Sequence, residues 1–281
     1  MSILLCAGEA GLLYTPGVGA PWRALPCPLR CPSLLVRNTR AIAAADERAH
    51  TLWLDGRLLP LDGGVEALCR CEAGILCLSG DTDCLTLLDP RTGLPLVTAP
   101  VGVYPQDVCL LSSQAAAVCG GMDGTLRLLR LPELTPLQAI RCPGSVQRVV
   151  RRGGTLYALC ACGDEALRCV LCRISLAPGR CEAVASWPGL PGCLHAEADG
   201  TLWIAASETL LRLPPGGPAS RVPGDYGLIR RLDSRSGCLL AADPVLGLCT
   251  LITPQGQRVL YEGDVEDARF LYPNVLTHAS Y

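Results

Sequence analysis

The chain of 281 residues contains 24 arginines, no lysine and 26 acidic residues, which gives a net charge of −2. Hydrophobic residues make up 49% of it, too many for a disordered protein. The lack of a basic excess argues against nucleic-acid binding. No apolar run approaches the roughly 20 residues that a helix needs to cross a bilayer.

The N-terminus does not resemble a secretory signal. No basic residue precedes Arg23, and Glu9 interrupts the first apolar stretch. We therefore expect a cytoplasmic protein with no membrane partner and no nucleic-acid partner. In a reducing compartment, most of the 18 cysteines would be core thiols, which behave as small hydrophobic residues.

Short apolar or alternating runs, separated by turn-forming residues, follow one another along the whole chain. With 30 glycines and 23 prolines, few stretches combine a helical period with freedom from helix breakers. The pattern predicts β-strands joined by tight turns and almost no helix.

Three runs stand at the start of the chain, namely Ile3–Ala7, Gly11–Tyr14 and Trp22–Leu25. From residue 33 onward the runs come in groups of four. One group comprises Ala67–Arg70, Ile75–Ser79, Cys84–Leu88 and Leu94–Ala99. The next comprises Val108–Leu111, Ala115–Cys119, Thr125–Leu131 and Leu137–Arg141.

The first runs of successive groups begin near residues 33, 66, 107, 147, 193, 229 and 267. A repeat of roughly 40 residues is typical of a four-stranded propeller blade. After residue 267 a single run remains, Ala268–Tyr272, and residues 1–32 supply the three runs that complete its blade. We predict one all-β domain over residues 1–281, a seven-bladed β-propeller of four-stranded blades whose last blade is closed by both termini. The alternative, a sandwich pair or two separate β domains, does not explain this three-plus-one division.

Part of the chain resembles a known repeat family. Leu88–Gly93 is a turn sequence, 101–108 reads Val-Gly-Val-Tyr-Pro-Gln-Asp-Val, and Gly120–Leu126 contains an Asp-Gly hairpin. These segments are similar to the turn, the link and the hairpin of YVTN-type β-propeller repeats, which are relatives of WD-repeat propellers. The resemblance is clear over residues 84–140, and Ala117–Gly120 replaces the eponymous strand motif. It implies a propeller but no activity, because the family includes unrelated functions.

Two cysteine pairs, Cys160-x-Cys162 and Cys169-x-x-Cys172, flank a short turn. Four thiolates near one point would hold zinc. However, residues three apart on a strand point to opposite faces, and the paired CxxC spacing of a zinc ribbon is missing. We therefore expect no metal site and no cofactor. A contact or a disulfide between Cys160 and Cys169 across the hairpin is an alternative.

Histidine chemistry has few candidates, because His50, His195 and His278 are the only three histidines. His195 lies in an inner run, and we expect it to be a structural residue rather than a general base. The sequence contains no Gly-x-Ser-x-Gly elbow and no phosphate-loop pattern. We predict no catalytic residue.

Polar residues in the links into the inner strands would lie where the channel of a propeller opens. They are Glu66, Asp107, Gln147, His195, Arg230 and Asp267. We predict a ligand-binding site at this channel mouth, where the three carboxylates would suit a divalent ion or a sugar-like ligand. The simpler alternative is that polar side chains at such an opening face water.

These features favour a monomeric, non-catalytic binding or scaffold module that takes a protein partner or a small ligand at the channel face. The alternative is a lactonase-like or other metal-assisted hydrolase that uses Glu66, Asp107 and Asp267. A third hypothesis is a redox or metal-storing protein built on its thiols.

Overall fold

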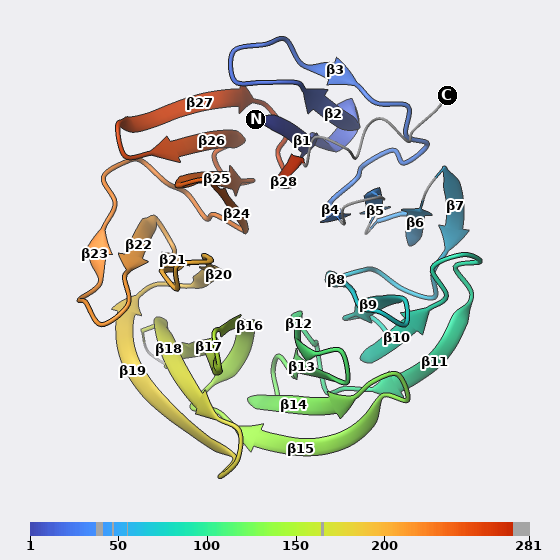
Figure 1. The fold of residues 1–281 in the computed structure, drawn as a ribbon, viewed down its shortest axis with the longest axis vertical. Coiled ribbons are helices and arrows are strands. Elements are labelled where there is room, and N and C mark those ends of the chain that lie inside the picture. Colours follow the sequence, from blue (N-terminus) through green and yellow to red (C-terminus); the bar gives the residue numbers. More distant parts are fainter. Residues whose placement is uncertain (38–41, 47, 55, 164–165, 272–281) are drawn as a thin grey trace. The chain divides into compact units, whose positions relative to one another are not determined.

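The computed structural model describes residues 1–37, 42–46, 48–54, 56–163 and 166–271. Within these ranges it contains 28 strands and one short 3-10 turn, Gly8–Ala10. The strands form seven antiparallel sheets of four strands each, the blades of a β-propeller (Figure 1). The prediction of an all-β, seven-bladed propeller is confirmed. No described helix has the length and hydropathy to span a membrane.

The chain forms two compact units, Met1–Val65 with Tyr226–Tyr281, and Glu66–Asp225. The prediction that all seven blades form a single domain stays a prediction. In chain order, the first strand of each blade is called its inner strand here. The inner strands begin at Leu34, Ala67, Asp107, Ser145, Pro191, Arg231 and Asp267.

The first unit contains three blades. One of them combines both ends of the chain, with the strand order β28-β1-β2-β3. Ile3 lies opposite Phe270 where β1 and β28 pair, so the predicted closure of this blade by both termini is confirmed. Its strands are β28 (Asp267–Leu271), β1 (Ser2–Cys6), β2 (Leu12–Thr15) and β3 (Arg23–Ala24). The second blade of this unit consists of β4 (Leu34–Arg37), β5 (Ile42–Asp46), β6 (Thr51–Leu54) and β7 (Arg57–Pro60). The third consists of β24 (Arg231–Arg235), β25 (Cys238–Asp243), β26 (Leu248–Thr253) and β27 (Gly256–Glu262).

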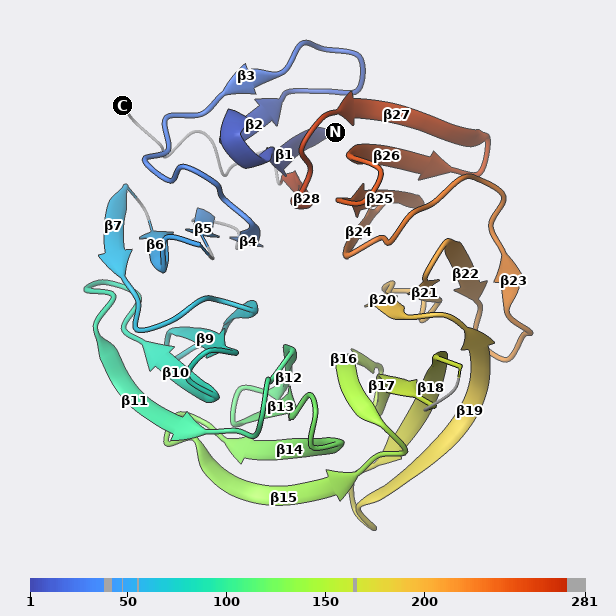
Figure 2. The ribbon, with the colours of Figure 1, turned by 180° about the vertical axis from the view of Figure 1, so that it is seen from behind.

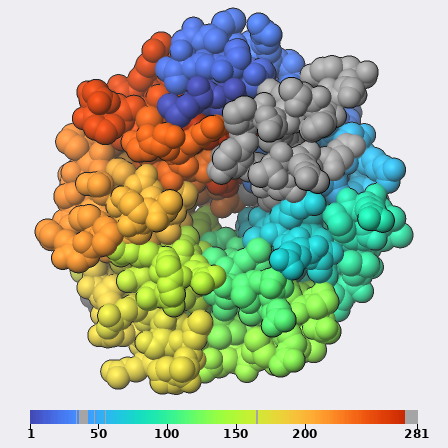
Figure 3. All heavy atoms as spheres, viewed as in Figure 1, coloured from blue at the N-terminus to red at the C-terminus, as the bar shows by residue number. Residues whose placement is uncertain are grey.

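The second unit contains four blades, which lie side by side in both ribbon views and pack closely in the space-filling view (Figures 1, 2 and 3). The first two blades are β8 (Ala67–Arg70), β9 (Ile75–Ser79), β10 (Cys84–Leu88) and β11 (Pro95–Pro100), then β12 (Asp107–Ser112), β13 (Ala115–Cys119), β14 (Thr125–Arg130) and β15 (Thr135–Arg141). The last two are β16 (Ser145–Arg152), β17 (Thr155–Cys162), β18 (Arg168–Ser175) and β19 (Arg180–Pro188), then β20 (Pro191–Ala196), β21 (Leu202–Ala206), β22 (Thr209–Leu213) and β23 (Ser220–Arg221).

Burial depends on a strand's place in its blade. The second strand β9 is buried along its whole length, whereas the outer strand β11 is mostly exposed. Second strands are apolar on both faces because a neighbouring blade covers each face of the sheet. Small thiols such as Cys77 and Cys119 fill positions in these layers. All 18 cysteines are thiols, of which ten are buried and eight are half-buried.

The substitution Phe270→Ala tests the core of the blade that joins both termini. Phe270 is the only phenylalanine of the chain and is 0% exposed, in a core cluster with Ile3 and Leu240. Its truncation should lower the free energy of unfolding by about 3–5 kcal/mol, because it leaves a cavity. Urea denaturation followed by circular dichroism measures the loss. The control Leu94→Ala, at a side chain that is 64% exposed, should change stability by no more than about 0.5 kcal/mol. Equal losses would contradict this account of the core.

Candidate functional site

The six residues predicted at the channel mouth lie at or near the starts of inner strands. Glu66 and Arg230 directly precede β8 and β24, Asp107 and Asp267 begin β12 and β28, and Gln147 and His195 lie within β16 and β20. Arg230 is exposed and Asp267 is fully buried, and the other four are half-buried. Glu66, Asp107, Gln147 and His195 belong to the second unit, and Arg230 and Asp267 belong to the first.

Asp107 joins two blades of the second unit. Its Oδ1 accepts a hydrogen bond from its neighbour Val108 N at 2.9 Å, and its Oδ2 accepts one from Val149 N at 3.0 Å. Val149 belongs to β16, the inner strand of the next blade. The carboxylate therefore accepts a hydrogen bond from the backbone N–H of Val149, for which no ladder between the two sheets offers an acceptor.

The first unit repeats this arrangement twice. Asp233 Oδ2 accepts a hydrogen bond from Phe270 N at 2.8 Å, and Asp267 Oδ2 accepts one from Leu35 N at 3.0 Å. In both cases the donor lies in the inner strand of the following blade. The ion pair between Asp267 Oδ1 and Arg269 Nε, at 3.1 Å, balances the buried charge. Asp107 and Asp267 thus have structural bonds at the positions where the sequence predicted a ligand.

Arg148 is a buried residue of the same region that the sequence analysis missed. It is 8% exposed, and its guanidinium donates to the carbonyls of Gln106, Gln147 and Gly192 at 3.4, 2.8 and 3.0 Å. These acceptors belong to the link before β12, to β16 and to β20. One side chain thereby connects three consecutive blades. The only signal in the sequence is an arginine within the apolar inner run 146–150.

An exposed apolar cluster lies at the link before β12. Val103, Tyr104 and Met122 are 49%, 55% and 71% exposed, and we call these three residues the Tyr104 surface. Met122 N donates to Val103 O at 3.0 Å, so the link 101–106 and the turn between β13 and β14 are held together. Gly121 permits this approach, because a Cβ there would lie 1.7 Å from Tyr104 O.

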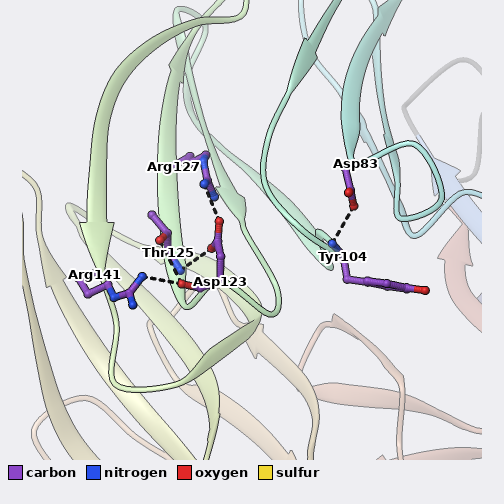
Figure 4. A network of polar contacts seen from close by, with 6 residues as sticks. All are labelled: Asp83, Tyr104, Asp123, Thr125, Arg127 and Arg141. Atoms are coloured by element: carbon purple, nitrogen blue, oxygen red, sulfur yellow. Dashed lines mark hydrogen bonds and ion pairs between the residues drawn. The ribbon is translucent and has the colours of Figure 1, made fainter.

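Tyr104 has an unusual backbone conformation. Its φ is +51°, in the left-handed region that bulky residues rarely adopt. The Asp83 carboxylate, from the turn between β9 and β10 of the preceding blade, accepts a hydrogen bond from Tyr104 N at 2.8 Å (Figure 4). This bond fixes the strained backbone and directs the ring into solvent.

Asp123 organises the other side of the Tyr104 surface. Its Oδ1 accepts a hydrogen bond from Thr125 N at 2.9 Å, and its Oδ2 pairs with Arg127 Nη2 at 2.5 Å (Figure 4). Arg141 Nη1 donates to Asp123 O at 2.7 Å, which holds an exposed guanidinium near Met122. The result is a rigid apolar cluster with a positive charge at its border.

Two more exposed leucines lie at the corresponding edge of the next blade. Leu190 directly precedes β20 and is 44% exposed, and Leu167 precedes β18 and is 49% exposed. Gly189 N donates to Leu167 O at 2.9 Å, so the two leucines lie on adjacent segments. The second unit therefore exposes apolar side chains at more than one link.

The hairpin of β17 and β18 separates Cys160 from Cys169, the two thiols for which the sequence left a contact open. Cys160 and Cys172 share one core cluster, with their sulfurs 4.0 Å apart, whereas Cys169 lies in another cluster with Leu171. The predicted opposite orientation of Cys169 and Cys172 is confirmed, and the alternative of a Cys160–Cys169 contact is wrong. Among the described residues, no group of three or more His, Cys, Asp or Glu side chains is arranged to hold a metal ion.

Comparisons with known proteins give the fold and nothing finer. No family model and no curated protein matches the chain, so the YVTN-type resemblance stays a prediction. A protein of unknown function from Desulfotomaculum acetoxidans aligns with a TM-score of 0.71 at 11% identity, over 96% of this chain and 99% of its own. A protein from Bacteroides uniformis, named only provisionally as a 6-phosphogluconolactonase, aligns with a TM-score of 0.72 at 12% identity over the same shares. The WD40 propeller domain of Doa1 aligns with a TM-score of 0.70 at 9% identity, over 86% of each chain.

The substitution Asp107→Ala tests the bond between blades. It should lower the free energy of unfolding by about 1–3 kcal/mol, because it leaves the N–H of Val149 without its acceptor. Asp107→Asn retains a carbonyl oxygen and should cost less. Chemical denaturation of the two variants and of the exposed-site control Glu133→Ala measures the difference. A loss no larger in Asp107→Ala than in the control would show that the bond does not stabilise the fold.

Proposed function

We propose that this protein is a non-catalytic binding module that takes a protein partner on the Tyr104 surface. One observation carries the proposal: an aromatic ring is held in solvent by a strained backbone that Asp83 fixes. Strain of this kind concentrates at functional sites. Exposed aromatic residues beside methionine are also characteristic of the centres of protein interfaces.

The border of the surface indicates the chemistry of the partner. Arg141 is exposed, and its bond to Asp123 O uses one of the five donors of a guanidinium. The remaining geometry suits a carboxylate. We therefore propose a partner segment that presents an apolar side chain to Tyr104 and Met122 and an adjacent acidic residue to Arg141.

The hydrolase alternative has less support. It requires Glu66, Asp107 and Asp267 as ligands of an ion, yet Asp107 and Asp267 accept backbone hydrogen bonds that join blades. Asp267 also pairs with Arg269. The provisionally named lactonase shares the fold at 12% identity, and a shared propeller fold does not carry an activity.

The test is selection from a peptide library displayed on phage, followed by measurement of Kd for an enriched peptide by fluorescence anisotropy. Enriched sequences should combine a large apolar residue with Asp or Glu. Tyr104→Ala should weaken binding about tenfold or more, because an aromatic at the centre of an interface contributes at least about 1.4 kcal/mol. Leu94→Ala, which truncates an exposed leucine beside β11, should leave Kd unchanged.

Asp83→Ala separates a positioned ring from a merely apolar one. This variant keeps Tyr104 but removes the acceptor of its N–H, so it should weaken binding by less than Tyr104→Ala and by more than Leu94→Ala. The proposal is wrong if no sequence class is enriched, or if the enriched peptides bind Tyr104→Ala and the parent protein equally well.

A further inference from the structure

A cavity opens in the first unit between the loop 16–22 and the outer strand β27. The loop connects β2 to β3 and runs beside β27 in both ribbon views (Figures 1 and 2). The volume of the cavity is about 360 Å³, which lies in the range of about 300–1,000 Å³ that is usual for small-molecule sites. The Tyr104 surface belongs to the second unit and shares no residue with this cavity.

One side chain supplies all the charge in the lining of the cavity. It is Arg258 of β27, and every other lining residue is uncharged. Arg258 is exposed, and among the described residues it has neither a hydrogen bond nor an ion pair. The five N–H donors of its guanidinium are therefore available to a ligand, and no acidic side chain of the lining competes for them.

The loop that faces Arg258 is held in shape by its own hydrogen bonds. Thr15 is 3% exposed, and its hydroxyl lies 2.9 Å from Gly17 O and 3.1 Å from Ala20 O. Gly19 has a φ of +88°, which favours glycine. A Cβ at Gly19 would lie 3.6 Å from Arg258 Nη2, so the guanidinium lies directly over this turn. The polar end of the cavity is consequently formed before any ligand binds.

Trp22 forms an apolar wall of the same cavity. Its Nε1–H donates to Leu260 O at 2.9 Å, and its ring meets that of Tyr261 edge to face, with centroids 5.8 Å apart. Because its N–H is already bonded, the indole offers apolar surface rather than a hydrogen-bond donor. Val18 and Val259, which are 37% and 43% exposed, add aliphatic surface to the lining.

We propose that this cavity binds a small organic carboxylate with an apolar body. The two carboxylate oxygens match the planar fork of the Arg258 guanidinium, and the apolar part of the ligand contacts Trp22 and the two valines. A single guanidinium balances the single charge of a carboxylate, whereas a phosphate dianion would keep an excess charge beside apolar walls. The site would give the protein a small-molecule ligand in addition to a partner on the Tyr104 surface.

Titration of the full-length, ¹⁵N-labelled protein with phenylacetate, followed by NMR, tests the proposal without any substitution. The indole N–H resonance of Trp22, assigned with Trp22→Phe, should shift in a saturable manner. The other three tryptophans, Trp53, Trp187 and Trp203, should not respond. Phenylacetamide has nearly the same shape but no charge, so it should bind at least about tenfold more weakly.

Two arginine variants separate a direct contact from a general effect of charge. Arg258→Gln and Arg23→Gln remove the same charge from β27 and β3, and Arg23 is exposed but does not line the cavity. Arg258→Gln should weaken the binding of phenylacetate about tenfold. Arg23→Gln should change it less than about twofold, because salt screens exposed charges. Circular dichroism checks that both variants are folded.

The absence of a saturable shift at Trp22, equal affinities for phenylacetate and phenylacetamide, or equal losses in the two arginine variants would overturn the proposal. Sulfate that binds as tightly as phenylacetate would indicate a simple anion site. A peptide that binds far more tightly than phenylacetate, and only with a free C-terminus, would indicate a chain terminus as the ligand. Either of these results would contradict the assignment of a small organic carboxylate.

Discussion

Within each unit the described sheets meet face to face; no β-ladder joins one described sheet to the next, and the isolated bridge described between two blades is that of Gly121 with Val146. The direct polar bond between neighbouring inner strands is therefore the interaction that fixes how they sit against each other. In the second unit, Asp107 makes this bond to Val149 N, and in the first unit Asp233 makes it to Phe270 N. Side-chain packing is tolerant of small shifts, whereas a buried N–H without an acceptor costs its full desolvation energy. The carboxylates thus specify the relation of the sheets more sharply than the apolar layers do.

The same constraint accounts for the charged residues that the inner strands contain. A buried arginine is stable only if its donors are satisfied, and Arg148 meets this requirement with three backbone carbonyls. Arg269, which is half-buried, pairs with Asp267 and donates to Leu232 O. Polar side chains near the starts of inner strands consequently serve the backbone of adjacent blades, and a polar residue at such a link is not by itself a sign of a ligand.

Local patterns sufficed to predict the strands and the split blade. Ile75–Ser79 and Ala115–Cys119 are strands with the predicted bounds, because turn residues flank a short apolar run in each case. The opposite orientation of Cys169 and Cys172 followed from the two-residue period of a strand. The sequence could not predict the bond of Asp83 to Tyr104 or the carbonyls around Arg148. Each of these joins residues of different blades, and the contact depends on packing between sheets rather than on any local period.

A link between blades can hold strain that a strand cannot. Within a ladder, every residue must keep an extended backbone to donate and accept in register, whereas Tyr104 lies between β11 and β12 and needs only one acceptor, Asp83. Gly121 removes the Cβ that would otherwise keep the neighbouring turn away from Tyr104 O. The inner strands are occupied with holding blades together, so the links are the part of the second unit in which side chains are available for recognition. This division of roles explains why the exposed Tyr104 and Met122 lie in a link and in a turn rather than at the polar residues that the sequence singled out.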